Sequence, residues 1–167
     1  MNKAELVLCL VDGQNIYYTP REKWGRKIDY GKLLRRVERA GKNRVVFPIA
    51  FLVSDPLIDS DLFVRHLEKM GYQVRMKLLY HNGGSLENTN WDDEIIAFSS
   101  AAIGEYDTLA MVSGDSDFIP LLNYARNLGK RVEVFSFEDD LSHSIESEAD
   151  EVFLLDESIC MNPKKRE

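Results

Sequence analysis

The sequence has no long hydrophobic run and very little cysteine. No stretch approaches the roughly 18 consecutive apolar residues that a membrane span needs, so we expect no membrane partner. The first apolar run covers only residues 6–11 and has no cleavage site, which argues against a signal peptide. Cys9 and Cys160 do not have the spacing of zinc ligands. We therefore expect two free thiols, as is usual in a cytoplasmic protein.

Internal repeats, low-complexity tracts and linkers are also missing from the sequence. A chain of 167 residues with 44% hydrophobic and 29% charged residues has the size and composition of one globular domain. We predict a single domain over residues 1–160, followed by a basic tail over 161–167.

Positive charge is scarce overall but concentrated in one segment. The net charge of −7 argues against a general nucleic-acid coat protein. Residues 21–44 nevertheless hold ten of the 21 basic residues and only three acidic ones. This segment is either a patch that faces phosphate groups or an ordinary solvated helix face, and the sequence leaves both interpretations open.

Hydrophobic periodicity predicts an alternating order of strands and helices. Short apolar runs of the kind that form strands occupy 6–11, 45–53, 72–79, 108–112, 131–135 and 152–155. Helical patterns occupy 29–40, 59–70, 91–103, 118–128 and 141–149, while 17–27 and 81–90 are predicted as loops. This alternation predicts an α/β fold, namely a three-layer α/β/α sandwich with a mainly parallel central sheet.

Acidic residues follow the predicted strands or open the predicted helices at three places. Asp12 follows the first strand, Asp115 and Asp117 follow the fourth, and Asp92 opens a helix beside Asp93. Ligands bind beyond the carboxyl ends of strands in such sheets, so we expect these acids to converge there. Converging carboxylates repel one another unless a cation lies between them, and all-oxygen ligation favours Mg²⁺ or Mn²⁺. The alternative for the pair after the fourth strand is simple capping of the next helix.

Three fragments together resemble the NYN domain, specifically its LabA-like branch. They are Val11-Asp12-Gly13-Gln14-Asn15, Asn90-Trp91-Asp92, and Ser113-Gly114-Asp115-Ser116-Asp117-Phe118 followed by Pro120-Leu121. The similarity extends from about Leu6 to Leu155. The resemblance implies a PIN-like fold and a metal-dependent ribonuclease.

Residue by residue, the resemblance implies four catalytic and metal-binding acids: Asp12, Asp92, Asp115 and Asp117, with Asp93 as the alternate for Asp92. On the substrate side it implies that Asn15 orients a carboxylate, a water or a phosphate, and that Ser113 lies at the same edge. The family usually carries a second Asp six residues further along the helix and a lysine near its start. This chain has Phe98 at the first position and Thr89 or Asn90 at the second.

The leading hypothesis is a Mg²⁺- or Mn²⁺-dependent phosphodiesterase that hydrolyses RNA. Single-stranded RNA is the expected partner, because aromatic side chains can stack bases and basic ones can contact the backbone. The candidate substrate-binding residues are Tyr17, Tyr18, Arg21, Lys23, Trp24, Arg26 and Lys27. Ordinary packing of a long loop is the alternative for the aromatic residues.

The alternative function is a non-catalytic RNA- or metal-binding regulatory module, and a homo-oligomer is left open. Two further enzyme or signalling classes fit less well. A phosphatase of doubly wound fold commonly has a second Asp two residues after the first, where this chain has Gln14. A receiver-like signalling domain needs a lysine after a late strand, but Lys130 precedes the strand at 131–135.

Overall fold

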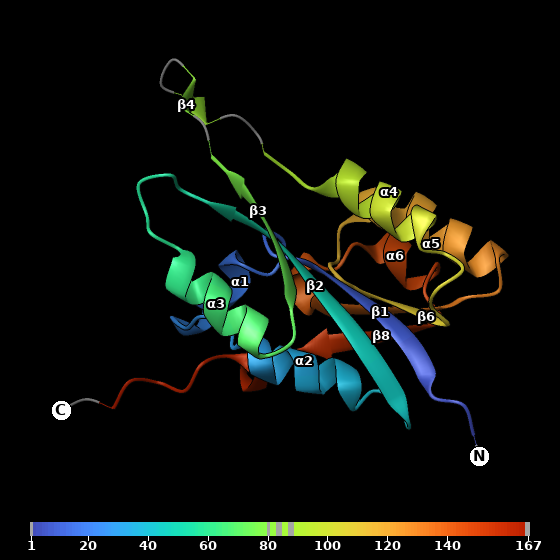
Figure 1. Ribbon diagram of the computed structural model, residues 1–167. Coiled ribbons are helices and arrows are strands. Elements are labelled where there is room, and N and C mark those ends of the chain that lie inside the picture. Colours follow the sequence, from blue (N-terminus) through green and yellow to red (C-terminus); the bar gives the residue numbers. More distant parts are fainter. Residues whose placement is uncertain (1, 80, 83–84, 87–88, 166–167) are drawn as a thin grey trace.

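A six-stranded sheet forms the centre of the computed structural model, which describes residues 2–79, 81–82, 85–86 and 89–165 (Figure 1). The strand order is β3-β2-β1-β6-β7-β8, and every neighbouring pair is parallel. The strands are β1 (Glu5–Asp12), β2 (Arg44–Ser54), β3 (Gln73–Leu78), β6 (Thr108–Val112), β7 (Arg131–Phe137) and β8 (Glu151–Leu155). The predicted α/β class with a mainly parallel sheet is therefore confirmed.

Strand β1 explains why its sequence is continuously apolar. Val7 and Val11 belong to the hydrophobic core on one face of the sheet, whereas Leu8 and Leu10 belong to the core on the other. All four side chains are buried. A parallel strand that is covered on both faces has no solvent-facing side, so it needs no polar alternation.

Helices cover both faces of the sheet and complete the predicted three layers (Figure 1). One core includes Leu33 of α2 and Leu67 of α3, and the other includes Ile95 of α4, Leu121 of α5 and Ile145 of α6. The helices are α1 (Tyr18–Trp24), α2 (Tyr30–Glu38), α3 (Asp61–Lys69), α4 (Asp92–Ala101), α5 (Ile119–Asn127) and α6 (His143–Glu146). Short 3₁₀ turns η1 (Ser116–Phe118), η2 (Glu138–Asp140) and η3 (Glu157–Ile159) follow β6, β7 and β8.

The order of strands reverses beside β1. The chain first builds outward from β1 through β2 to β3, and then returns to place β6 on the other side of β1. The segments that follow β1 and β6 therefore lead to helices on opposite faces of the sheet, with Leu33 of α2 in one core and Leu121 of α5 in the other. In open α/β sheets this switch point at the carboxyl edge is where ligands bind.

Three local predictions are corrected or completed. The predicted loop over 17–27 is wrong, because 18–24 form α1; Pro20 lies in its first turn, where proline is tolerated, and Gly25 ends it at φ 62°. The helix predicted over 141–149 is restricted to α6, with η2 before it. The predicted loop at 81–90 falls partly outside the described residues, and in its described part β4 (His81–Asn82) pairs with β5 (Ser85–Leu86).

An ion-pair network with a buried centre at Arg44 and Glu133 joins the strands at the amino edge of the sheet. Arg44 of β2 pairs with Glu5 of β1 at 3.0 Å and with Glu133 of β7 at 2.8 Å. Arg131 also pairs with Glu133, at 3.1 Å, and extends the network to Glu151 of β8. Arg44 is thus a structural residue and contributes nothing to a basic surface.

Two expectations about cysteine and membrane segments can be compared with this fold. Cys9 and Cys160 are both free and buried. Within the described ranges, none of the helices is long and apolar enough to cross a membrane.

Candidate metal centre

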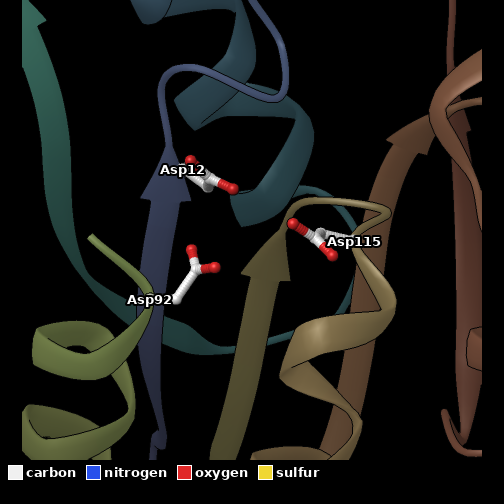
Figure 2. A group of neighbouring side chains, drawn as sticks. All are labelled: Asp12, Asp92 and Asp115. Carbon is white, nitrogen blue, oxygen red and sulfur yellow. The ribbon is translucent and has the colours of Figure 1, made fainter. Parts of the chain in front are cut away.

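Three carboxylates from separate elements converge at the switch point (Figure 2). Asp12 is the last residue of β1, Asp92 is the first residue of α4, and Asp115 lies in the turn between β6 and η1. One carboxylate oxygen from each lies within 4.8 Å of the others, and no other such group of three was found among the described residues. The three side chains point into a common space from the strand ends and the helix start.

The spacing of these oxygens suits a divalent cation. Around an ion with metal–oxygen distances of about 2.1 Å, ligand oxygens lie about 3 Å apart when adjacent and about 4 Å apart when opposite. The three observed oxygens all lie within 4.8 Å of one another, a limit that includes such distances. The donor set is entirely carboxylate, which is the set that hard divalent cations prefer.

Asp12 is held in an environment that disfavours its charge. Burial raises the pKa of its carboxyl group to about 6, and the negative charges of Asp92 and Asp115 act in the same direction. Hydrogen bonds from the Ser113 side chain and the Asn15 backbone oppose the rise without cancelling it. A cation between the three acids would relieve this cost, because it favours the ionised form.

The loop after β6 is fixed against the loop after β1 by direct hydrogen bonds. The Ser113 hydroxyl donates to Asp12 Oδ2 at 3.1 Å and accepts from the Asp115 backbone N–H at 3.2 Å. The Gly114 N–H donates to Asn15 Oδ1 at 3.0 Å. Ser113 and Asn15 therefore connect the two strand ends that carry Asp12 and Asp115.

Glycine is required twice in these loops because the backbone packs too closely for a side chain. A Cβ at Gly114 would lie 2.3 Å from the Asp140 carbonyl oxygen and 2.5 Å from Ser136 Oγ. A Cβ at Gly13 would lie 2.8 Å from the Phe51 carbonyl oxygen. The Asp-Gly and Gly-Asp dipeptides of the sequence thus combine an acidic residue of the cluster with a close backbone approach.

Asp115 fulfils the capping alternative as well as joining the cluster. Its Oδ1 accepts a hydrogen bond from the Asp117 N–H at 2.9 Å, which caps η1. A carboxylate has two oxygens with several acceptor positions, so this cap does not consume the group. Capping and cluster membership are compatible at this residue.

The other two predicted acids are not members of the group of three. Asp117 is exposed and lies outside the group of three, although its charge helps to raise the pKa of Asp92. Burial is the main cause of that raised pKa, with Asp115 as the next contributor. Asp93 is exposed and also lies outside the group, so the geometry favours Asp92 over its neighbour.

Phe98 lies away from the cluster, in the hydrophobic layer between α4 and the sheet. It is six residues from Asp92, which corresponds to about 9 Å along a helix. Its ring packs against the core, and the Arg75 guanidinium lies 5.1 Å from the ring centroid. A carboxylate at this position would enter a mainly apolar environment.

The predicted substrate-binding residues of α1 divide into two groups. Tyr17 and Tyr18 are 46% and 62% exposed, and the Arg21 guanidinium stacks on the Tyr17 ring at 3.5 Å. Trp24, in contrast, packs against Phe137 with ring centroids 5.7 Å apart, which supports the packing alternative for this aromatic residue.

Two of the other basic residues predicted to bind substrate, Lys23 and Arg26, contact other parts of the chain. Lys23 pairs with Asp139 at 3.1 Å. Arg26 donates to the Met161 carbonyl at 2.7 Å and pairs with Glu157 at 3.5 Å, while Lys27 is exposed. Lys23 and Arg26 are therefore engaged within the chain, whereas Lys27 is open to solvent.

Sequence reasoning did not identify Lys77 of β3, which contacts the start of α4. Its Nζ donates to the Asn90 carbonyl at 2.7 Å and pairs with Glu94. The available signal was its place near the carboxyl end of a predicted strand, the edge at which the acids were expected.

Comparison with known proteins relates this arrangement to a family. A crystal structure of a protein of unknown function from Vibrio parahaemolyticus has the same fold, with a TM-score of 0.81 and 25% sequence identity over 96% of this chain and 100% of that one. No curated protein matches the sequence significantly. The NYN domain family matches residues 7–156. This match covers most of the chain, so the protein belongs to the NYN domain family, a family of PIN-like nucleases.

Proposed function

We propose that this protein is a metal-dependent ribonuclease of the LabA-like branch that hydrolyses phosphodiester bonds in single-stranded RNA. The observation that carries the proposal is the convergence of Asp12, Asp92 and Asp115 at the switch point of the sheet. Without a cation these acids would repel a phosphate group, so the proposal requires a metal.

Mg²⁺ or Mn²⁺ fits the all-carboxylate donor set best. Asp12, Asp92 and Asp115 would hold the ion, and the exposed Asp117 beside them would hold its water ligands. When bound, the ion supplies Lewis acidity, which lowers the pKa of a water and stabilises charge on the leaving oxygen.

The protein residues have three tasks in this reaction. One carboxylate of the cluster accepts the proton of the water that attacks phosphorus, while the bond to the leaving oxygen breaks. Ser113 and Asn15 keep the β1 and β6 loops at a fixed separation through their hydrogen bonds. Tyr17 and Tyr18 offer exposed rings for base stacking, with Arg21 as the nearby cation for the RNA backbone.

The test is cleavage of a mixed-sequence single-stranded RNA by the pure protein, with Mn²⁺ or Mg²⁺ and with a chelator. We expect cleavage that requires metal and falls at least about 100-fold in Asp115→Asn, as loss of a group needed for proton transfer or metal binding implies. Asp93→Asn is the matched control, because this exposed acid lies one residue from Asp92 but outside the cluster.

The same experiment separates the enzyme from a regulatory module. If Asp115→Asn leaves RNA affinity unchanged and the unsubstituted protein cleaves nothing in either metal, the nuclease proposal fails. A larger loss of cleavage in Asp93→Asn than in Asp92→Asn would contradict the assignment of the helix ligand.

A further inference from the structure

The start of α4 has little capping from its own sequence, where Asn90 Oδ1 accepts one hydrogen bond from the Asp92 N–H at 3.3 Å. Trp91 at the N-cap position makes no side-chain capping hydrogen bond, and the first turn carries Asp92, Asp93 and Glu94. These acids suit the helix dipole but repel one another. Asp92 is also the one cluster member that is not attached to the end of a strand or the turn that follows it.

Trp91 provides one part of this support, from β2. The side chain is 8% exposed, and its Nε1 donates to the Leu52 carbonyl at 2.8 Å. Its ring also meets the Phe51 ring, with centroids 5.4 Å apart. This anchor fixes the position of the helix start against the sheet, but it does not balance the charge of the first turn.

Lys77 provides the other part, from the edge strand β3. Its Nζ donates to the Asn90 carbonyl at 2.7 Å, lies 4.4 Å from the Trp91 ring centroid and pairs with Glu94. These three contacts fall on both sides of Asp92 in the sequence. One ammonium group therefore connects the residues that enclose a cluster ligand, and it brings positive charge to the acidic turn.

We propose that Lys77 is a positioning residue for the metal centre, one that sets metal affinity by fixing the N-terminus of α4 and so the Asp92 carboxylate. This inference rests on the metal site of the proposed function. Lys77 is not a ligand, since an ammonium group offers no lone pair to a cation. Residues that orient metal ligands commonly change metal affinity by about 10- to 100-fold when they are lost.

If Lys77 only stabilised the fold, its loss would lower thermal stability at least as much as it weakens metal binding. The side chains of Lys77 and Glu94 are 28% and 49% exposed, and ion pairs this accessible add little to the free energy of unfolding. Loss of Lys77 should therefore affect metal binding far more than thermal stability.

The experiment is calorimetric titration of the metal-free protein with Mn²⁺, below the unfolding temperature. We expect Lys77→Ala to weaken Mn²⁺ binding by about tenfold and Lys77→Arg, which keeps a cation and donors, to weaken it less. Lys77→Gln serves as the second variant if Lys77→Ala does not fold, with the same loss expected. The control is Lys130→Ala, which removes another lysine that lies over an aromatic ring, 5.7 Å from the Tyr106 centroid, and should leave affinity unchanged.

A double-variant cycle tests the route through Asp92. In an Asp92→Asn background, removal of Lys77 should cause no further loss of Mn²⁺ affinity, because the group that it positions is gone. Equal losses in both backgrounds, or no loss in Lys77→Ala, would overturn the inference. Absence of Mn²⁺ binding by the unsubstituted protein would overturn both proposals, whereas normal binding without RNA cleavage would count against the nuclease alone.

Discussion

Asp12 is a residue whose ionisation opposes folding. Burial raises its pKa to about 6, compared with an ordinary value of 3.8. Between these values the folded protein keeps a proton that the unfolded chain has lost, so the free energy of unfolding decreases as the pH rises through this window. Above pH 6 both states are ionised, and the folded state bears the full cost of the buried charge.

Asp12→Asn should therefore stabilise the metal-free protein at neutral pH. Asn has the same shape and can accept the Ser113 hydrogen bond, but it carries no charge. We expect the variant to gain on the order of 2 kcal/mol at pH 7.5 in chelator, and the gain to disappear near pH 4. Urea unfolding at several pH values would measure this.

Glu105→Gln, an exposed acid outside the cluster, is the control and should show no such pH dependence. Added Mn²⁺ should reverse the order of stability, because a bound ion stabilises only the variant with its ligands intact. If Asp12→Asn is less stable than the unsubstituted protein at every pH, the buried charge of Asp12 does not destabilise the fold.

At the scale of elements, α1 shows why neighbouring aromatic residues have different roles. Residues 17–27 were predicted as a loop, and their aromatics as stacking groups or packing residues. Helix formation turns Trp24 toward Phe137 and the core, and leaves Tyr17 and Tyr18 on the surface. The helix thus separates a packing residue from candidate base-stacking residues.

Trp24→Ala and Tyr17→Ala should consequently affect different properties, namely fold stability and RNA binding. We expect Trp24→Ala to lower the free energy of unfolding by about 2–4 kcal/mol, because it removes a large side chain from the core. Tyr17→Ala should leave stability within about 0.5 kcal/mol and weaken single-stranded RNA binding by about 1–3 kcal/mol, the usual worth of one stacked base. Thermal unfolding and fluorescence anisotropy with a labelled RNA would measure the two effects.

Tyr18→Ala is the matched second variant for RNA binding, since this ring is the more exposed of the pair. Unchanged RNA affinity in both tyrosine variants would remove α1 from the proposed substrate path.

The elements also show what the sequence could and could not predict about the site. Asp12 and Asp115 were predictable because each follows an apolar run that only a buried strand explains. Asp92 was favoured over Asp93 by the Asn-Trp-Asp fragment, and the geometry agrees. The sequence placed Lys77 near the carboxyl end of a predicted strand, but its contacts with the start of α4 depend on which side of β2 the strand β3 lies.

For the whole molecule, the alternation of strands and helices was sufficient to predict three layers and a mainly parallel sheet. It could not show where the basic side chains of residues 21–44 would lie. Some are exposed, some contact the C-terminal segment, and one is buried. Arg44 is the extreme case, because its side chain is 1% exposed and it connects β1, β2 and β7 at the amino edge. The two edges of the sheet thus differ: paired charges stabilise one, and unpaired acids lie at the other.

Arg44→Met should destabilise the whole fold, because it leaves Glu133 buried beside only one partner, Arg131. We expect a loss of about 3–5 kcal/mol, the usual effect of removing one partner from a buried pair. Denaturant unfolding would measure it, with Arg126→Met as control, since the Arg126–Asp150 pair is 39% and 31% exposed and should matter by less than about 1 kcal/mol. A small decrease in the free energy of unfolding of Arg44→Met would show that water reaches the ion-pair network.

The position of β6 beside β1 also has a consequence for the order of folding during synthesis. Strand β1 can pair with β2 as soon as the first third of the chain is available, but its other edge pairs with a strand that begins at Thr108. Until then one side of this apolar strand is an open edge, which is the kind of surface that recruits other chains. Ser113 reaches Asp12 across 101 residues of sequence, so the same late pairing that closes this edge also assembles the acidic centre. A chain that has not yet protected itself from aggregation therefore has no complete acidic cluster either.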